Sequence, residues 1–387
     1  MRTKQKMPPQ MANGSAKLPT WVDIGLLPLI NVALAFVVSG LLIATLGQDP
    51  FEATWIMLRG AFGYEESLGY TFYYTTNFIF TGLAVAVAFH GGLFNIGGEG
   101  QAYIGGLGVA IACLALDQYL PFGLLLPICV LAAALFGAGW AFIPAYLQAK
   151  RGSHVVITTI MFNFIAASLM VYLLVNVVIK PGQMSPESRE FASSAWLPYM
   201  HEALAWFGWE VAQSPLNLSL IGALVCCVLV WGLIWHTRWG YEIRAVGANA
   251  EAAVYAGISP SKIIILAMCI SGALSGFVGI NELMGVQHRL LLDFAAGYGF
   301  TGIAVSLMGR NHPVGIILAG LLFGALYQGG AELAFENSAF SPDLIVVIQG
   351  LVVLFSGALS YMLRGPMERL YLRLRPPPPP PIASVEA

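Results

Sequence analysis

Long apolar segments recur from near the start of this chain almost to its end, and they constrain its fold more than any other feature. Most are close to the ~20 residues that a helix needs to cross a bilayer. Turn residues or charges separate them, and we predict ten spans, at 24–46, 70–90, 96–116, 122–147, 155–179, 216–236, 263–285, 298–309, 313–335 and 342–363. The segment 298–309 is short, which predicts a broken helix or one extended by its neighbours. The expected fold class is an all-α polytopic membrane protein.

The scarcity of charge excludes several other classes of protein. Charged residues make up 10% of the 387 residues, against roughly 25% in an ordinary soluble domain. A soluble enzyme or a disordered chain needs more charge than this, and a nucleic-acid binder needs a basic face. The five cysteines all lie in apolar runs without a zinc-type spacing, so we expect apolar fillers and no metal or other cofactor.

The placement of basic residues predicts the orientation in the membrane. Ten spans put both termini on one side, and assigning that side to the cytoplasm gives it fourteen of the 18 basic residues. The other side receives Arg59, Lys180, Arg189 and Arg289. We therefore predict a cytoplasmic N-terminal segment at 1–20, a transmembrane domain at 21–363 and a cytoplasmic proline-rich tail at 364–387. Within the domain, 181–215 is the extracytoplasmic loop and 237–262 a cytoplasmic one.

A glycine-rich segment with polar residues interrupts the apolar pattern at 91–101. It contains Asn95, Glu99 and Gln101. Non-helical backbone at membrane depth is tolerated only when it is buried in protein or lines a wet cavity, and broken helices build many transporter sites. We interpret the segment as lining a solute path, and the alternative is tight helix packing with Glu99 capping a broken helix end.

Other polar residues at membrane depth extend this candidate path. Charged or amide side chains there are costly and usually face the interior of a bundle, although each one taken alone also fits an interhelical hydrogen bond. The candidate set is Asn77, Asn95, Glu99, Gln101, Asn163, Asn281 and Glu282. A second glycine-rich break lies at 297–302. If spans two to five and seven to ten are related, they have opposite orientations and form an inverted repeat.

The loop at 237–262 carries the signals of a short helix outside the membrane. Asn249 suits an N-cap, Glu251 the first turn and Gly257 the residue after the last turn. Such a helix lies on the membrane surface or docks into a cytoplasmic partner. No GxxxxGK[ST], HExxH or GxSxG motif occurs in the sequence, so we expect no ATP hydrolysis, protease or lipase chemistry in this chain.

Three blocks of sequence together resemble the permease subunits of ABC importers in the ribose/branched-chain amino acid class. They lie at 76–101, at 244–258 and at 297–315, and the resemblance covers roughly 70–360. Within that class the chain is most similar to the nucleoside and simple-sugar branch. One departure is Ser153-His154-Val155, where that branch has an Asn-Glu pair, and it bears on the substrate more than on the fold.

The resemblance implies partners and roles. It implies a cytoplasmic ABC ATPase, a second permease chain of the same or another kind, and a periplasmic or lipid-anchored solute-binding protein, all at a bacterial inner membrane and without nucleic acid. The residues that match the ATPase-coupling segment are Arg244, Gly247, Asn249, Ala252, Ala253 and Gly257. Glu251, in the first turn of the expected helix, joins them as a coupling candidate.

Three alternatives stay open for the activity. A permease for a simple sugar such as a pentose or hexose fits the same motifs. An ion-coupled secondary transporter fits the spans, but would need an ion site and no ATPase. An intramembrane enzyme would need a nucleophile and a base, for which His90 and Glu99 form the one plausible pair.

Overall fold

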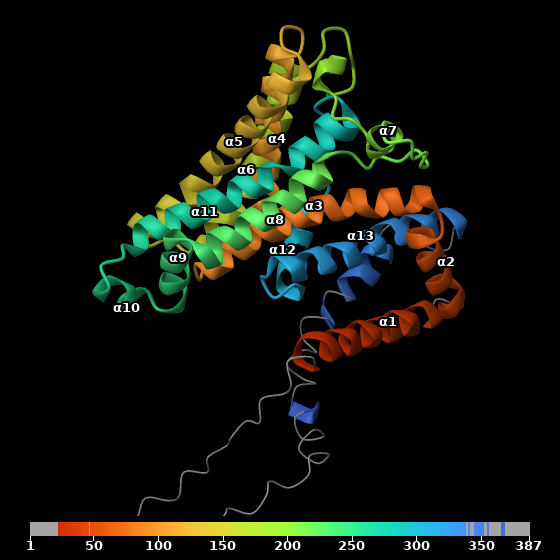
Figure 1. Ribbon diagram of the computed structural model, residues 1–387, viewed down its shortest axis with the longest axis horizontal. Helices are drawn as coiled ribbons and strands as arrows, with labels where there is room; N and C mark the ends of the chain where they lie inside the picture. The colour runs from red at the N-terminus through yellow and green to blue at the C-terminus, as the bar shows by residue number, and fades with distance from the viewer. Residues whose placement is uncertain are drawn as a thin grey trace, which may run out of the picture. The chain divides into compact units, whose positions relative to one another are not determined.

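The computed structural model describes residues 22–45, 47–337, 340, 344–351, 354–355 and 365–367. They fall into two compact units, one with the described residues up to 42 and from 350 on, the other with those from 43 to 349. Apart from two isolated bridges, the described residues form no β-structure. The α-helices (Figure 1) are α1 Leu27–Thr45, α2 Pro50–Phe62, α3 Glu65–His90, α4 Gly98–Leu116, α5 Phe122–Arg151, α6 Val155–Leu173, α7 Met200–Ala205, α8 Ser219–His236, α9 Arg238–Ala248, α10 Ala250–Tyr255, α11 Pro260–Gly276, α12 Tyr298–Met308 and α13 Pro313–Glu336.

Among the described residues, seven helices are long and apolar enough to cross a membrane. Two of them continue beyond the α-helix as π-helical turns, α6 into Leu174–Val178 and α11 towards Ile280–Gln287. These seven match predicted spans two to seven and nine. The helices at the first and eighth predicted spans, α1 and α12, are shorter apolar helices. Most of the tenth predicted span lies outside the described residues, as do 1–20 and most of the tail, so the count of ten and the side of the termini stay predictions.

The helix α2 was absent from the predicted spans. It is too short and too polar to cross a membrane, with Glu52 in its first turn and Arg59 in its last. Its start signals are nevertheless present in the sequence: Asp49 is the N-cap and accepts a hydrogen bond from the Phe51 N–H at 2.8 Å, and Pro50 occupies the first helical position.

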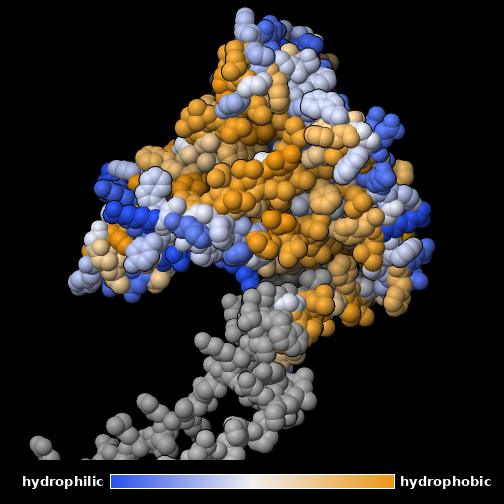
Figure 2. Space-filling model, in the orientation of Figure 1, coloured by the Kyte–Doolittle hydropathy of each residue, from blue (hydrophilic) through white to orange (hydrophobic). Residues whose placement is uncertain are grey.

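The helices α3 and α4 form the centre of the larger unit. The most apolar stretch of α3 is 83% buried and that of α4 78%, against 22% for α5 and α6. The helix α3 packs against α8, α11, α12 and α13, while α4 packs against α5, α6, α11 and α12. The outer helices leave large apolar side chains exposed. On the face drawn in Figure 2, hydrophobic residues cover the middle of the bundle and hydrophilic ones gather around α9. Such a band is what lipid-facing helices present.

Glycines allow α11 to lie directly against its neighbours. A Cβ atom on Gly272 would stand 2.4 Å from the Gly137 carbonyl oxygen of α5, and one on Gly105 of α4 would stand 2.2 Å from the Gly276 Cα. The small-residue pattern Gly272-xxx-Gly276 therefore lies at a close helix crossing. Contacts of this kind bring backbones together without a hydrophobic driving force, which lipid does not supply.

Candidate functional site

The first turn of α4 is buried, and the segment 91–97 before it is not helical. Asn95 holds this break. Its Nδ2 donates to Gln101 Oε1 at 3.0 Å and to Ser271 Oγ of α11 at 2.9 Å, and its Oδ1 accepts from the Gly97 N–H at 2.9 Å. Because Asn95 is fully buried, its polar atoms need partners inside the protein. The contacts fix the start of α4 to α11.

Asn163 of α6 supports the same break from the other side. Its Oδ1 accepts from the Gly100 N–H at 2.9 Å, and its Nδ2 donates to the Ile96 carbonyl at 2.8 Å. The first N–H groups of a helix have no partner within the helix. One side chain of α6 therefore satisfies two backbone groups that the broken helix leaves unpaired.

Glu99 joins the N-termini of two helices. It lies in the first turn of α4, and its two carboxyl oxygens accept from the Gly297 and Gly299 N–H groups at the start of α12, at 2.9 and 2.8 Å. The backbones are in contact here, since a Cβ on Gly299 would stand 2.1 Å from the Glu99 nitrogen. Both helix ends carry partial positive charge, which the carboxyl group complements. Glu99 thus caps α12 from the neighbouring helix.

A second polar cluster surrounds Glu282, which lies in the π-helical turns at Ile280–Gln287. Glu282 Oε1 accepts from the Tyr73 hydroxyl and from Asn77 Nδ2 of α3, both at 2.6 Å. Asn281 Nδ2 donates to Asn77 Oδ1 at 2.9 Å. The α11 side of this cluster is thereby tied to α3 by side chains that the sequence separates by more than 200 residues.

Asn281 extends this cluster towards α8. Its Oδ1 accepts from Asn217 Nδ2 at 2.9 Å and from Ser219 Oγ at 2.7 Å. Ser219 is the first residue of α8, and its N–H donates to Asn217 Oδ1 at 3.0 Å. The polar residues of three helices therefore form one connected network.

The structure divides the seven candidate path residues into two groups. Asn95, Glu99, Gln101 and Asn163 surround the break before α4, whereas Asn77, Asn281 and Glu282 form the network between α3, α11 and α8. Each has at most 7% of its surface exposed. In this conformation they fill the interior and do not line an opening.

Tyrosines beside the Glu282 cluster were missed at the level of sequence. Tyr298 opens α12 between the two glycines that Glu99 holds, and its ring lies 5.6 Å from Phe78 and 6.3 Å from Tyr327, centroid to centroid. Tyr73 packs against Tyr74 at 5.0 Å. Aromatic residues in an apolar span resemble ordinary core packing. The one feature of the sequence that singles out Tyr298 is its position inside the glycine-rich break at 297–302.

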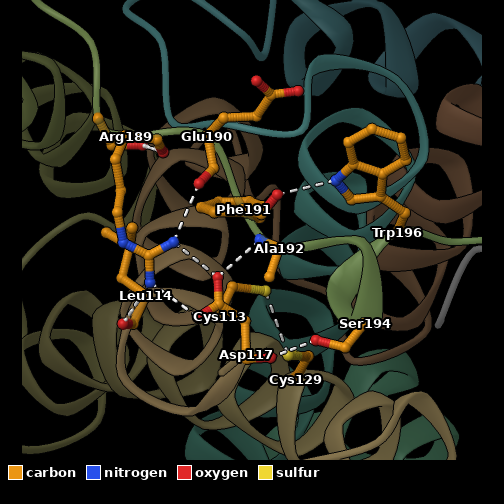
Figure 3. A network of polar contacts seen from close by, with 11 residues as sticks. Cys113, Leu114, Asp117, Cys129, Arg189, Glu190, Phe191, Ala192, Ser194 and Trp196 are labelled. Carbon is orange, nitrogen blue, oxygen red and sulfur yellow. Dashed lines mark hydrogen bonds and ion pairs between the residues drawn. The ribbon is translucent and has the colours of Figure 1, made fainter. Parts of the chain in front are cut away.

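An ion pair holds the loop at 181–215 to the end of α4 (Figure 3). Arg189 donates to both Asp117 oxygens, at 2.7 and 2.8 Å, and to the Leu114 carbonyl at 2.8 Å. The Ala192 N–H also donates to Asp117, at 2.8 Å. Burial alone would raise the pKa of Asp117, but the hydrogen bonds from Arg189 and Ala192 hold it below its usual value.

The same loop covers the segment that leads into α12. The Phe191 N–H donates to the His288 carbonyl at 2.7 Å, and the Ser188 N–H to the Leu290 carbonyl at 3.0 Å. The Trp196 ring stacks on His288 with centroids 4.2 Å apart. Burial lowers the pKa of His288 below its usual value. The loop and the segment 288–297 therefore form one packed layer, which Asp117 anchors to α4.

The loop at 237–262 forms two short helices. Asn249 ends α9 and caps α10, with its Oδ1 accepting from the Ala252 N–H at 3.0 Å, and Gly257 follows α10 at φ +77°. The predicted caps are confirmed, although α10 itself has only six residues. Of the seven coupling candidates Ala253 is buried, and the other six, Arg244, Gly247, Asn249, Glu251, Ala252 and Gly257, are exposed.

Gly247 connects this loop with the break before α4. A Cβ on Gly247 would stand 2.2 Å from the His90 carbonyl oxygen and 2.8 Å from the Gly92 nitrogen. The end of α9 therefore lies directly on the start of the segment 91–97. On α10, which follows α9, Val254 and Tyr255 are 57% and 95% exposed. The contact of Gly247 with the break is therefore followed along the chain by an exposed apolar surface.

The structure gives His90 and Glu99 different partners. His90 Nε2 lies 3.1 Å from the Asn311 carbonyl and its ring packs against Trp235, while both Glu99 oxygens accept from α12. The pair needed for an intramembrane enzyme is thus not assembled. Within the described residues, no three His, Cys, Asp or Glu side chains gather as metal ligands would.

Comparison with known proteins identifies one family. The permease component of branched-chain amino acid transport systems matches residues 67–357. A glucose ABC transporter permease of Haloferax volcanii is 36% identical over 87% of this chain and 88% of its own length. A guanosine ABC transporter permease of Bacillus subtilis is 35% identical over 89% and 96%, and a nucleoside ABC transporter permease of Lactococcus lactis is 32% identical over 85% and 90%. No solved structure is significantly similar.

Proposed function

Because the chain belongs to the family of branched-chain amino acid transport permeases, we propose that it forms the solute pathway of an ATP-driven ABC importer for nucleosides or related sugar-containing solutes. It is a multi-pass membrane protein and a permease subunit, and the relatives are permeases too. The observation that carries the proposal is the meeting of two buried helix N-termini, α4 and α12, at Glu99. Broken helices that point their N-termini into the interior are a common way to build a transporter site.

The solute class rests on the relatives. One carries glucose in its name, one guanosine and one nucleosides, at similar identities. A nucleoside and a glucose molecule share a ring with neighbouring hydroxyl groups. The alternative of a pentose or hexose permease therefore remains, and uptake of labelled guanosine and of labelled glucose by cells carrying the whole importer decides between them.

The proposed path uses both polar groups described above. Solute passes the outer group with Asn77, Asn281 and Glu282, then the break held by Asn95, Glu99, Gln101 and Asn163. The closed packing of these residues is one state of an alternating-access cycle, and separation of α4 from α12 opens the other. Glu99→Gln tests the inner group: uptake equal to wild type at several pH values would remove any charge-dependent role.

Two related breaks support an inverted repeat. Non-helical residues 91–97 precede α4, and 288–297 precede α12. The two helices then meet at their N-termini. With span two and span seven as the corresponding partners, the predicted orientations put one break on the cytoplasmic half and the other on the outer half of the membrane. Both termini lie in the cytoplasm in this proposal.

The partner ATPase docks on α10. Its motion reaches the path through Gly247, which contacts the start of the break at Gly92, and from there through Asn95 to α4. Replacing Asn249–Val254 with a Gly/Ser stretch removes the cap and the exposed Val254 side chain and leaves Tyr255 in place. Assembly should remain normal, while uptake and substrate-stimulated ATPase activity fall together. Normal uptake with normal assembly would contradict the coupling role.

The other partners act on the outer side and in the membrane. A periplasmic or lipid-anchored binding protein delivers solute to the face formed by the extracytoplasmic loop, and a second permease chain, identical or related, completes the pathway. Two differently tagged copies of the chain, produced in the same cells, should copurify if the permease is a homodimer and should not if it is a heterodimer. Uptake that survives ATP depletion and stops with an ionophore would indicate a secondary transporter instead.

A further inference from the structure

Glu282 combines deep burial with an incomplete set of hydrogen bonds. Both of its hydrogen bonds, from Tyr73 and from Asn77, reach Oε1, and no described residue donates to Oε2. Its exposure is 2%. A carboxyl group at membrane depth is costly and is generally retained for function. It also stands in π-helical turns, which occur frequently at functional sites.

Glu99 differs from Glu282 in this respect. Each of its oxygens accepts a backbone N–H of α12. A solute cannot take either place without moving the helix. Glu99 is therefore a positioning residue, and what it positions is Tyr298, which lies between Gly297 and Gly299.

A series of packed aromatic rings begins at the Glu282 cluster. Tyr73, whose hydroxyl reaches Glu282, packs on Tyr74, and Tyr74 lies 5.7 Å from Tyr327, centroid to centroid. Tyr327 in turn contacts Phe78 at 5.0 Å and Tyr298 at 6.3 Å. Aromatic faces beside hydrogen-bonding groups suit a molecule with one flat apolar face and one edge of hydroxyls.

We propose that Glu282, assisted by Asn77 and Tyr73, binds two neighbouring hydroxyl groups of the solute's sugar ring, while Tyr298 and Tyr327 pack against the ring or its attached base. The inference rests on the function proposed above and names the recognition group within it. Acidic side chains bind ribose hydroxyls in the same manner in dinucleotide-binding folds. In the closed state the Tyr73 hydroxyl and the Asn77 amide donate to Oε1 and keep the buried carboxyl group hydrogen-bonded.

Pairs of solutes that differ by one hydroxyl test this assignment. Cells carrying the whole importer take up a labelled ribonucleoside or its 2′-deoxy form, and glucose or 2-deoxyglucose. The binding protein also selects solutes, but it is the same in every strain, so its effect cancels in the ratio of variant to wild-type uptake. The pair that wild type transports shows whether the sugar ring comes from a nucleoside or from a hexose.

Glu282→Gln should lower uptake of the ribonucleoside about tenfold and change its 2′-deoxy form less than about twofold, because only the former offers two neighbouring ring hydroxyls to two acceptors. 2-Deoxyglucose keeps such a pair at C3 and C4, so its uptake should fall together with that of glucose. Glu282→Asp keeps the carboxyl group and should give a smaller loss of the same pattern. Glu99→Gln should lower both members of a pair equally, through Tyr298. Glu66→Gln, an exposed carboxyl in the first turn of α3, is the matched control with unchanged uptake. Membrane abundance of each variant normalises the rates.

Equal losses for the ribonucleoside and its 2′-deoxy form, or no loss for a transported solute, in Glu282→Gln and Glu282→Asp would overturn the proposal. If Glu282→Gln does not reach the membrane, the aspartate variant decides alone. A wild-type importer that transports none of the four solutes would refute the proposed function instead, so the two failures are distinguishable.

Discussion

The Asp117–Arg189 ion pair should control how often the loop at 181–215 opens. Asp117→Asn removes the charge and one acceptor oxygen. The Asp117 side chain is fully buried in the wild type, so water does not replace the lost contacts. The substitution leaves Arg189 or the Ala192 N–H without its full partner (Figure 3). Breaking a buried pair costs about 3–5 kcal/mol, but the Arg189 side chain is 33% exposed and regains water.

We therefore expect a loss of about 2 kcal/mol, below the range for fully buried pairs. Since 1.4 kcal/mol is a factor of ten, the open population of the loop rises about 30-fold. The Phe191 N–H, which donates to the His288 carbonyl, reports this opening. Its hydrogen exchange should speed up by the same factor, while amides in the middle of α3 keep their rates.

A double-mutant cycle with Arg189→Gln separates the pair from its surroundings. If the two residues act together, the double variant exchanges about as fast as either single variant. Exchange at Phe191 within about twofold of wild type in Asp117→Asn, or fully additive effects in the cycle, would refute the reasoning. Uptake in Asp117→Asn then shows how far the loop also matters for transport.

Three further predictions concern other contacts. Gly299→Ala should destabilise the protein by about 1–3 kcal/mol and abolish uptake, because its Cβ would stand 2.1 Å from the Glu99 nitrogen; Gly139→Ala, with nothing within 4 Å, should be neutral in the same thermal-unfolding assay. The folded pKa of Asp117 is lowered, so its contribution is complete above its unfolded pKa of about 3.9 and is lost as pH falls through the folded value; exchange at Phe191 should accelerate there in wild type and not in Asp117→Asn. Asn249→Ala should weaken α10 by about 1 kcal/mol and reduce substrate-stimulated ATPase activity, whereas Asn249→Ser, which also caps, should keep most of it.

Local signals in the sequence predicted the helices and their ends well where one residue decides them. The apolar runs predicted all seven long spans, and Asn249 and Gly257 predicted the ends of α10. The helix α2 was not predicted because its polar residues give it no long apolar run, although Asp49 and Pro50 mark its start. Local propensity carries little information about a helix whose environment is unknown.

The candidate site shows the same boundary between sequence and structure. The polar residues at depth were found from the sequence because burying them is costly wherever the chain places them. Their division into a break held by Asn95 and Asn163 and a network around Glu282 was not foreseeable, since it joins residues up to about 200 positions apart. Tyr298 was missed because a tyrosine in an apolar run has the same pattern whether it packs a core or lines a path.

The sequence by itself determined that this chain is a membrane protein and which of its long segments are helical. It also determined which costly polar groups the interior must accommodate. Hydrophobicity and backbone hydrogen bonding decide these properties because both act along the chain. Only the tertiary structure decided that Glu99 serves α12 and that Glu282 keeps an oxygen free of donors among the described residues. A hydrogen bond depends on distance in space. Which donor reaches which carboxyl oxygen follows from how α3, α4, α11 and α12 pack, and no local pattern encodes that.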